Sequence, residues 1–131
     1  MMDFEEFIKW LSVSLIEFKS FKALGGKAHF NAKYDQQNGY ITIRNSRFKL
    51  RLQKNPQFKG YKLKHDAIKK IFERFNNAPE SEKYMPRYYE LPPSKEKYIK
   101  GDYNRVYWSE APDMTATPTI PAIIKYWIKN E

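Results

Sequence analysis

Cysteine is absent from this sequence, and the only histidines are His29 and His65. Without cysteine the chain has neither a disulfide framework nor a thiolate metal site, a composition that suits the cytoplasm. No H-x-x-x-H or H-E-x-x-H pattern occurs, and Asp35, the only acid between residues 27 and 64, has no ligand partner near it in the sequence. The five glycines form no phosphate-binding loop. We therefore expect neither a metal nor a cofactor.

Long apolar runs are also missing, since none approaches the ~20 residues that span a bilayer. The start, "MMDFEEF", is acidic and lacks the basic segment with which a signal peptide begins. With 131 residues, 41% of them hydrophobic, the chain can form one compact domain with a core. We expect a single domain, 1–131, that is cytoplasmic and does not contact a membrane.

Acidic residues are scarce in one part of the chain only. Residues 27–64 contain ten Lys or Arg against one acid, a net charge of +9, whereas residues 1–26 sum to −1 and residues 65–131 to +1. The whole excess of +9 therefore comes from one block. A localised block of one sign can form a binding surface for a partner of the opposite sign.

The N-terminal segment predicts a helix. Asp3 is a good N-cap and Glu6 completes a capping box, while apolar residues recur from Phe4 to Phe18 at helical spacing. Gly25 and Gly26 favour a helix end at Leu24. A further helix is predicted from Asp66 to Asn76, with an apolar stripe that includes Ile68 and Phe72.

Between these helices the sequence predicts three strands. "KAHFNAKY" (27–34) and "YITIR" (40–44) alternate apolar and polar residues around Asn38-Gly39, which is typical of a hairpin turn. "RFKLRLQ" (47–53) alternates as strictly and predicts a third strand after a tight turn at Asn45-Ser46. The segment "NPQFKGYK" is then expected to be a loop.

Residues 78–131 are predicted to form a Tyr- and Pro-rich wrap followed by a C-terminal helix with Thr119 at its N-cap. Together with residues 3–77 this gives an α+β fold, a three- or four-stranded antiparallel sheet with helices packed on one face. The residues expected in the core are Phe4, Ile8, Leu11, Leu15, Phe30, Ile41, Ile43, Phe48, Leu50, Leu52, Ile68, Phe72 and Trp127.

On the three predicted strands, the side chains opposite the core carry six cations and no acid. Lys and Arg bind phosphates, and Tyr40 can stack on an unpaired base. Further lysines, among them Lys69 and Lys70, surround the first turn of the second helix. The sequence therefore predicts non-catalytic binding of nucleic acid or another polyanion by Lys27, Lys33, Tyr40, Arg44, Arg47, Lys49, Arg51, Lys62 and Lys64.

Three other interpretations stay open. A basic sheet face is often merely solvated, and lysines on strands discourage edge-to-edge aggregation. A metal-independent ribonuclease would use His29 as general acid or base, with His65 approaching it. A protein-interaction module, which would bind another protein or a second copy of itself as a homodimer, would use tyrosines, which are favoured at interfaces. Its contact residues would be Tyr84, Tyr88, Tyr89, Tyr98, Tyr103 and Tyr107.

Two resemblances accompany these patterns. The order helix, three strands, helix over residues 3–77, with "KLKHDAIKK" at the second helix, resembles that of double-stranded RNA-binding domains, and no residue roles are carried over from them. The segment "YWSEAPDMTATPTIPAIIKYW" resembles small orphan proteins of bacterial mobile gene cassettes, including those of integrons. Such proteins commonly have no assigned activity, so the resemblance implies no particular reaction.

Overall fold

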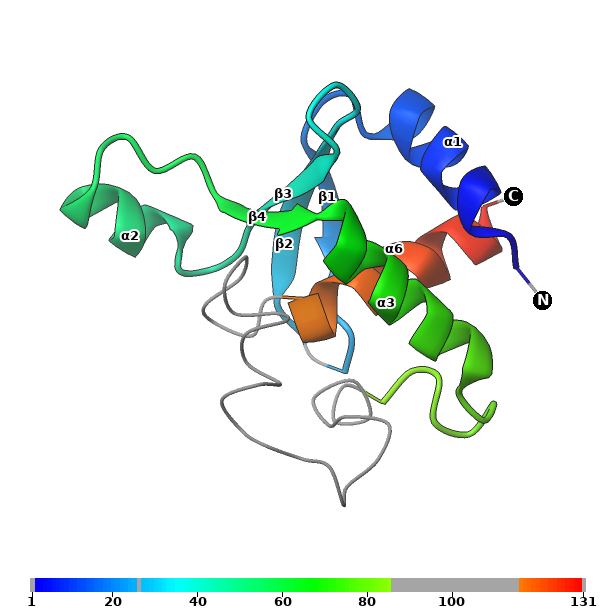
Figure 1. The fold of residues 1–131 in the computed structure, drawn as a ribbon. Coiled ribbons are helices and arrows are strands. Elements are labelled where there is room, and N and C mark those ends of the chain that lie inside the picture. The colour runs from blue at the N-terminus through cyan, green and yellow to red at the C-terminus, as the bar shows by residue number, and fades with distance from the viewer. Residues whose placement is uncertain (1, 26, 86–115, 131) are drawn as a thin grey trace, which may run out of the picture.

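The computed structural model describes residues 2–25, 27–85 and 116–130. The helices in these ranges are α1 (Phe4–Ser14), α2 (Phe48–Lys54), α3 (His65–Asn77) and α6 (Ala116–Lys129). The strands are β1 (Lys19–Lys22), β2 (His29–Asp35), β3 (Tyr40–Arg44) and β4 (Tyr61–Lys64), which form one antiparallel sheet in the order β1-β2-β3-β4. Figure 1 shows α1, α3 and α6 on one side of the sheet, whereas α2 projects away from it. The predicted α+β fold is confirmed.

Helix α1 begins as predicted and ends ten residues earlier than predicted, at Ser14 rather than Leu24. The Asp3 carboxylate accepts a hydrogen bond from the Glu5 amide at 3.0 Å. Near the end of the helix the Ser12 hydroxyl bonds the Ile8 carbonyl, and the Tyr34 amide donates to the Leu15 carbonyl at 2.7 Å. That last bond joins the end of α1 to β2. The chain then continues into β1, a strand that was predicted as part of the helix.

The predicted hairpin of β2 and β3 is confirmed. Gly39 has a φ of +70°, a left-handed conformation that suits glycine, and its amide donates to the Asp35 carbonyl at 2.8 Å. The Asp35 side chain accepts from the Asn38 backbone amide at 3.0 Å and from its side-chain amide at 2.8 Å. These bonds lower the pKa of Asp35 below its ordinary value of 3.8, the side-chain bond from Asn38 being the main cause.

The third predicted strand is wrong, because residues 48–54 form helix α2. Its residues, "FKLRLQK", include strong helix formers and no β-branched residue, and this propensity outweighs the apolar–polar alternation. Asn45 and Asn55 form a side-chain turn at each end of α2, accepting from the amides of Arg47 and Gln57. The strand on the other side of β3 from β2 is β4, of which only Tyr61 and Lys62 belong to the segment predicted as a loop. The order helix, three strands, helix is therefore not the order observed.

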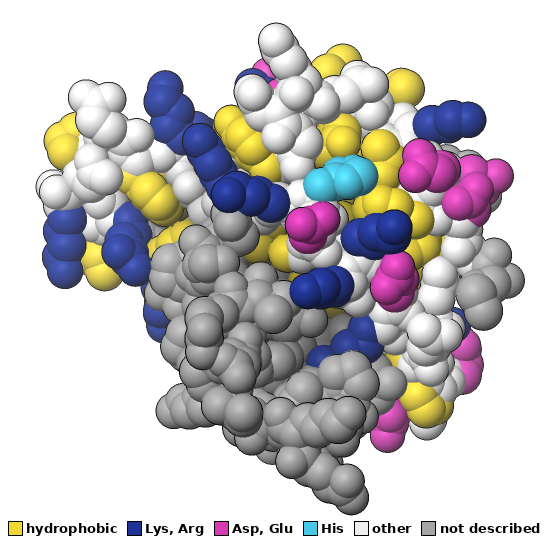
Figure 2. Space-filling view, in the orientation of Figure 1, with side chains coloured by type: hydrophobic (Ala, Val, Ile, Leu, Met, Phe, Trp, Pro, Cys, Tyr) yellow, Lys and Arg dark blue, Asp and Glu magenta, His cyan; other side chains and the backbone are white. Residues whose placement is uncertain are grey.

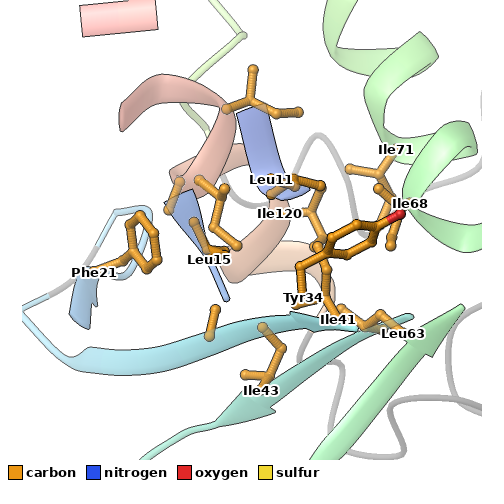
Figure 3. Packing of buried hydrophobic residues seen from close by; sticks show 14 of the residues in the cluster. Leu11, Leu15, Phe21, Tyr34, Ile41, Ile43, Leu63, Ile68, Ile71 and Ile120 are labelled. Carbon is orange, nitrogen blue, oxygen red and sulfur yellow. The ribbon is translucent and has the colours of Figure 1, made fainter. Parts of the chain in front are cut away.

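The core lies between the inner face of the sheet and helices α1, α3 and α6. Figure 3 shows it running from Phe21 of β1 at one end to Leu63 of β4 at the other. Of the predicted core, Phe4, Ile8, Phe48 and Leu52 are half-buried. Leu50 is 59% exposed and was predicted wrongly, because α2 lies away from the core. The other predicted core residues are buried, namely Leu11, Leu15, Phe30, Ile41, Ile43, Ile68, Phe72 and Trp127.

Helix α6 begins three residues before the predicted N-cap, Thr119, which is a buried residue inside the helix. Pro118, not Pro121, therefore falls in the first turn, where a missing amide proton costs little. Of the predicted apolar face of α6, Ile123, Ile124 and Trp127 are buried in the core, whereas Ile128 is exposed and Ile120 is buried in its place.

Candidate nucleic-acid interface

The outer face of the sheet, the side opposite the core, follows from the strand register. Its cross-strand rows are Lys22–His29, Ser20–Asn31–Arg44, Lys33–Thr42–Lys62 and Asp35–Tyr40–Lys64. Lys33, Tyr40 and Arg44 lie on this face, as predicted. Lys62 and Lys64 lie on it too, although the sequence had grouped them with the lysines around the first turn of the second predicted helix. Asp35 is the only acid of these rows.

Arg44, the last residue of β3, is held on this face by aromatic rings. Its guanidinium lies 4.0 Å from the ring centroid of Phe18 and 4.6 Å from that of Phe48. Its Nε also donates to the Lys59 carbonyl at 2.9 Å. A guanidinium between two rings is held in one orientation, and its remaining N–H groups can serve as donors.

Gly60 makes room for this arrangement. It has a φ of +133°, and a Cβ there would lie 2.7 Å from Cγ2 of Thr42, 2.8 Å from the Ile43 carbonyl oxygen and 3.3 Å from Cγ of Arg44. Only glycine combines that backbone conformation with so close an approach of the neighbouring strand. Neither Phe18 nor Gly60 was predicted as a functional residue, because neither belongs to a recognisable motif.

Helix α2 extends the positive charge beyond the sheet. Arg47, Leu50, Arg51 and Lys54 follow helical spacing and line an open hollow of about 390 Å³. No residue of α2 is buried in the core. The helix is instead attached through rings, with Phe48 lying 5.8 Å from Phe58 and Phe58 lying 5.1 Å from Tyr61 of β4. Arg47, Lys49 and Arg51, which were predicted on a strand, thus belong to a projecting helix.

These cations are grouped here as the basic surface: Lys33 together with the eight Lys and Arg of residues 44–64, a segment without any acid. Figure 2 shows Lys and Arg side chains gathered over α2 with no acidic side chain beside them on the visible face. Among the described residues no carboxylate pairs with Lys33, Lys49 or Lys62. The ammonium of Lys62 lies 4.7 Å from the ring centroid of Tyr40.

Lys27 lies apart from the basic surface. It is exposed in the turn between β1 and β2, beside the C-terminal half of α6. Lys69 and Lys70 are exposed on α3, in the helix layer on the other side of the sheet. The sequence analysis grouped these three lysines with the others, because predicted helices and strands do not show which exposed residues share one side of the folded protein.

The two histidines are not brought together. His29 begins β2, whereas His65 follows β4 next to the row of Asp35, about 20 Å away at ~3.3 Å per residue. The ring of His65 packs 5.3 Å from that of Phe4. The approach of His65 to His29 that a paired acid–base mechanism requires is therefore not observed.

The tyrosine-rich interface falls mostly outside the described residues, as Tyr88, Tyr89, Tyr98, Tyr103 and Tyr107 all do. Tyr84 is described, and it packs on the molecule itself, with its ring 5.8 Å from Phe75 and under the ammonium of Lys125. Within the described ranges, no three His, Asp or Glu side chains gather to hold a metal ion. No helix in these ranges is both long and apolar enough to cross a bilayer.

Compared with known protein families, with curated proteins and with solved structures, the chain has no match. The basic surface must therefore be interpreted from its own geometry and charge.

Proposed function

We propose that this protein binds nucleic acid, without catalysis, through the basic surface. One observation carries the proposal: residues 44–64 hold eight Lys or Arg and no acid, and the fold presents seven of them on the outer sheet face and on or next to α2, with Lys59 in the loop before β4. Such a surface releases counterions when it meets a polyphosphate, which is the main source of affinity in nucleic-acid binding. The alternative of a merely solvated strand face does not explain the cations of α2, because α2 is a helix and none of its residues is buried in the core.

The aromatic residues favour contact with unpaired bases on the sheet. Tyr40 is half-buried at the outer face beside the Lys62 ammonium, whereas the ring of Phe18 is covered by the Arg44 guanidinium. Rings among cations are the arrangement by which proteins hold single strands, with bases on the rings and phosphates on the cations. Helix α2, about 10 Å long at 1.5 Å per residue, adds phosphate contacts next to the sheet.

The test is fluorescence anisotropy with labelled single- and double-stranded DNA and RNA, titrated at several salt concentrations. Two charge-reversal pairs probe the two halves of the surface: Lys33→Glu with Lys62→Glu on the sheet, and Lys49→Glu with Lys54→Glu on α2. Each pair should weaken binding at least tenfold. Each should also reduce the log–log salt slope by about 2, at roughly 0.9 per lost contact on a duplex.

The matched control is Lys125→Glu with Lys129→Glu on α6, which changes the net charge equally and should alter affinity less than twofold. Equal losses in all three pairs would mean that only net charge matters. Absence of binding at about 0.15 M salt, where long-range attraction is screened, would also overturn the proposal.

A further inference from the structure

A second cationic site, here called the edge cleft, lies at the β1 edge of the sheet. It has a volume of about 520 Å³, within the range of small-molecule sites. Its lysines are Lys22 and Lys27 from the β1–β2 turn region and Lys125 and Lys129 from α6. None of these four belongs to the basic surface, although Lys22 is paired with His29 in the end row of the outer sheet face.

The floor of the edge cleft is apolar and already held in place. It is formed by Phe21, Leu24, Ala122 and Tyr126. The Tyr126 ring packs edge-on against Phe21 at 5.3 Å and lies 6.0 Å from Trp10, while the Lys19 ammonium lies 5.0 Å from its centroid. A floor fixed by such contacts needs little reordering when a ligand binds, which preserves affinity.

The walls are equally defined. One wall is a turn closed by the hydrogen bond from the Ala23 amide to the Ala28 carbonyl at 2.8 Å, and it includes Gly25 at a φ of +73°. The other wall is α6, where Lys125 and Lys129 are four residues apart and so share one face. The ring of Tyr84 lies 5.1 Å from the Lys125 ammonium.

The charge of the edge cleft is uncompensated within the described residues. No carboxylate lines it, and none of its four lysines makes an ion pair with a described acid. Lysines that line one hollow repel one another through their charges, and an anion bound among them relieves that repulsion. The floor, in contrast, offers mainly carbon atoms, which favour an apolar group over a polar one.

We propose that the edge cleft binds a small organic anion with an apolar body, a carboxylate, sulfonate or phosphate carried on an alkyl or aryl group. The anionic head lies among the four lysines, and the apolar body covers the Phe21–Tyr126 floor. This site is independent of the proposed nucleic-acid binding, because it uses different residues at another edge of the sheet.

The experiment measures the fluorescence of anilinonaphthalene sulfonate, an aromatic sulfonate, bound to the full chain. Lys125→Glu with Lys129→Glu should weaken its binding at least tenfold, and so should Lys22→Glu with Lys27→Glu on the opposite wall, which tests the site even if the first pair unfolds. The α2 pair Lys49→Glu with Lys54→Glu, of equal charge change, should alter binding less than twofold. Unchanged binding in a folded cleft variant would overturn the proposal.

Competition with the bound dye distinguishes whether the charge, the apolar body or both are recognised. Decanoate should displace the dye, whereas acetate and decanol at the same concentration should not, because each supplies only half of the recognised chemistry. Displacement by acetate alone would reduce the cleft to a simple ion site, and displacement by decanol alone to an apolar patch. Displacement by an oligonucleotide would mean that the dye binds where nucleic acid binds and not in a separate cleft. Each of these three outcomes overturns the proposal.

Discussion

At the scale of single residues, Gly60 connects the fold to the candidate site. Its missing side chain lets β4 lie against Thr42 while the Arg44 side chain extends toward the Lys59 carbonyl. The sequence did not reveal this role, because a lone glycine before "YKLK" carries no turn signature. What could be predicted residue by residue was burial on regular elements, such as Ile41 and Ile43 of β3, where period-two spacing and β-branching agree.

We predict that Gly60→Ala destabilises the protein far more than Gly39→Ala does. At Gly39 nothing lies within 4 Å of an added Cβ, so only the left-handed backbone is penalised, by about 1–2 kcal/mol. At Gly60 overpacking adds a further ~1–3 kcal/mol. Urea unfolding of both variants measures the difference, and equal losses would show that Gly60 is not constrained by its neighbours.

At the scale of elements, agreement between period and propensity separated correct predictions from wrong ones. Helix α3 and the β2–β3 hairpin satisfy both, and both were predicted. In α2 the two conflict, since its period-two pattern is made of helix-forming residues. Strands β1 and β4 have four residues each, too few for a pattern to emerge, and pairing with β2 and β3 defines them.

We predict that α2 can be removed without loss of the sheet. Arg44 ends β3 and Gly60 directly precedes β4, and the register Ile43–Tyr61 sets these two residues opposite each other. Replacing residues 45–59 by Asn-Gly should therefore close a two-residue hairpin. Far-UV circular dichroism and cooperative thermal unfolding should persist, whereas oligonucleotide affinity should fall at least tenfold. Loss of cooperative unfolding would show that α2 supports the fold.

At the scale of the whole molecule, three helices from distant parts of the chain meet in one aromatic cluster. The ring of Phe7 (α1) lies 5.2 Å from both Phe72 (α3) and Trp127 (α6), which lie 6.2 Å from each other. The apolar stripes of α3 and α6 were visible in the sequence, whereas the stripe predicted for α1 left out Phe7. The mutual contacts of the helices were not visible, because spacing indicates which face is buried and not which partner buries it.

We predict that Phe7→Ala costs about 3–5 kcal/mol of unfolding free energy, as does Trp127→Ala. The two should be coupled, with the double variant losing less than the sum by about 0.5–1.5 kcal/mol, typical of a ring pair. Urea denaturation gives these values, and Val13→Ala, at a side chain 74% exposed, should stay within about 0.5 kcal/mol of the parent. Strict additivity of the ring substitutions would contradict a shared cluster.

Helix α2 contributes no side chain to the core, and this gives the protein two largely separate sets of constraints. Selection for packing acts on the inner sheet face and on α1, α3 and α6, whereas selection for a partner can act on α2 with little thermodynamic penalty, as is usual for exposed positions. Homologues should therefore diverge fastest at residues 47–54. An engineer could exchange that segment to redirect affinity while leaving the scaffold as it is.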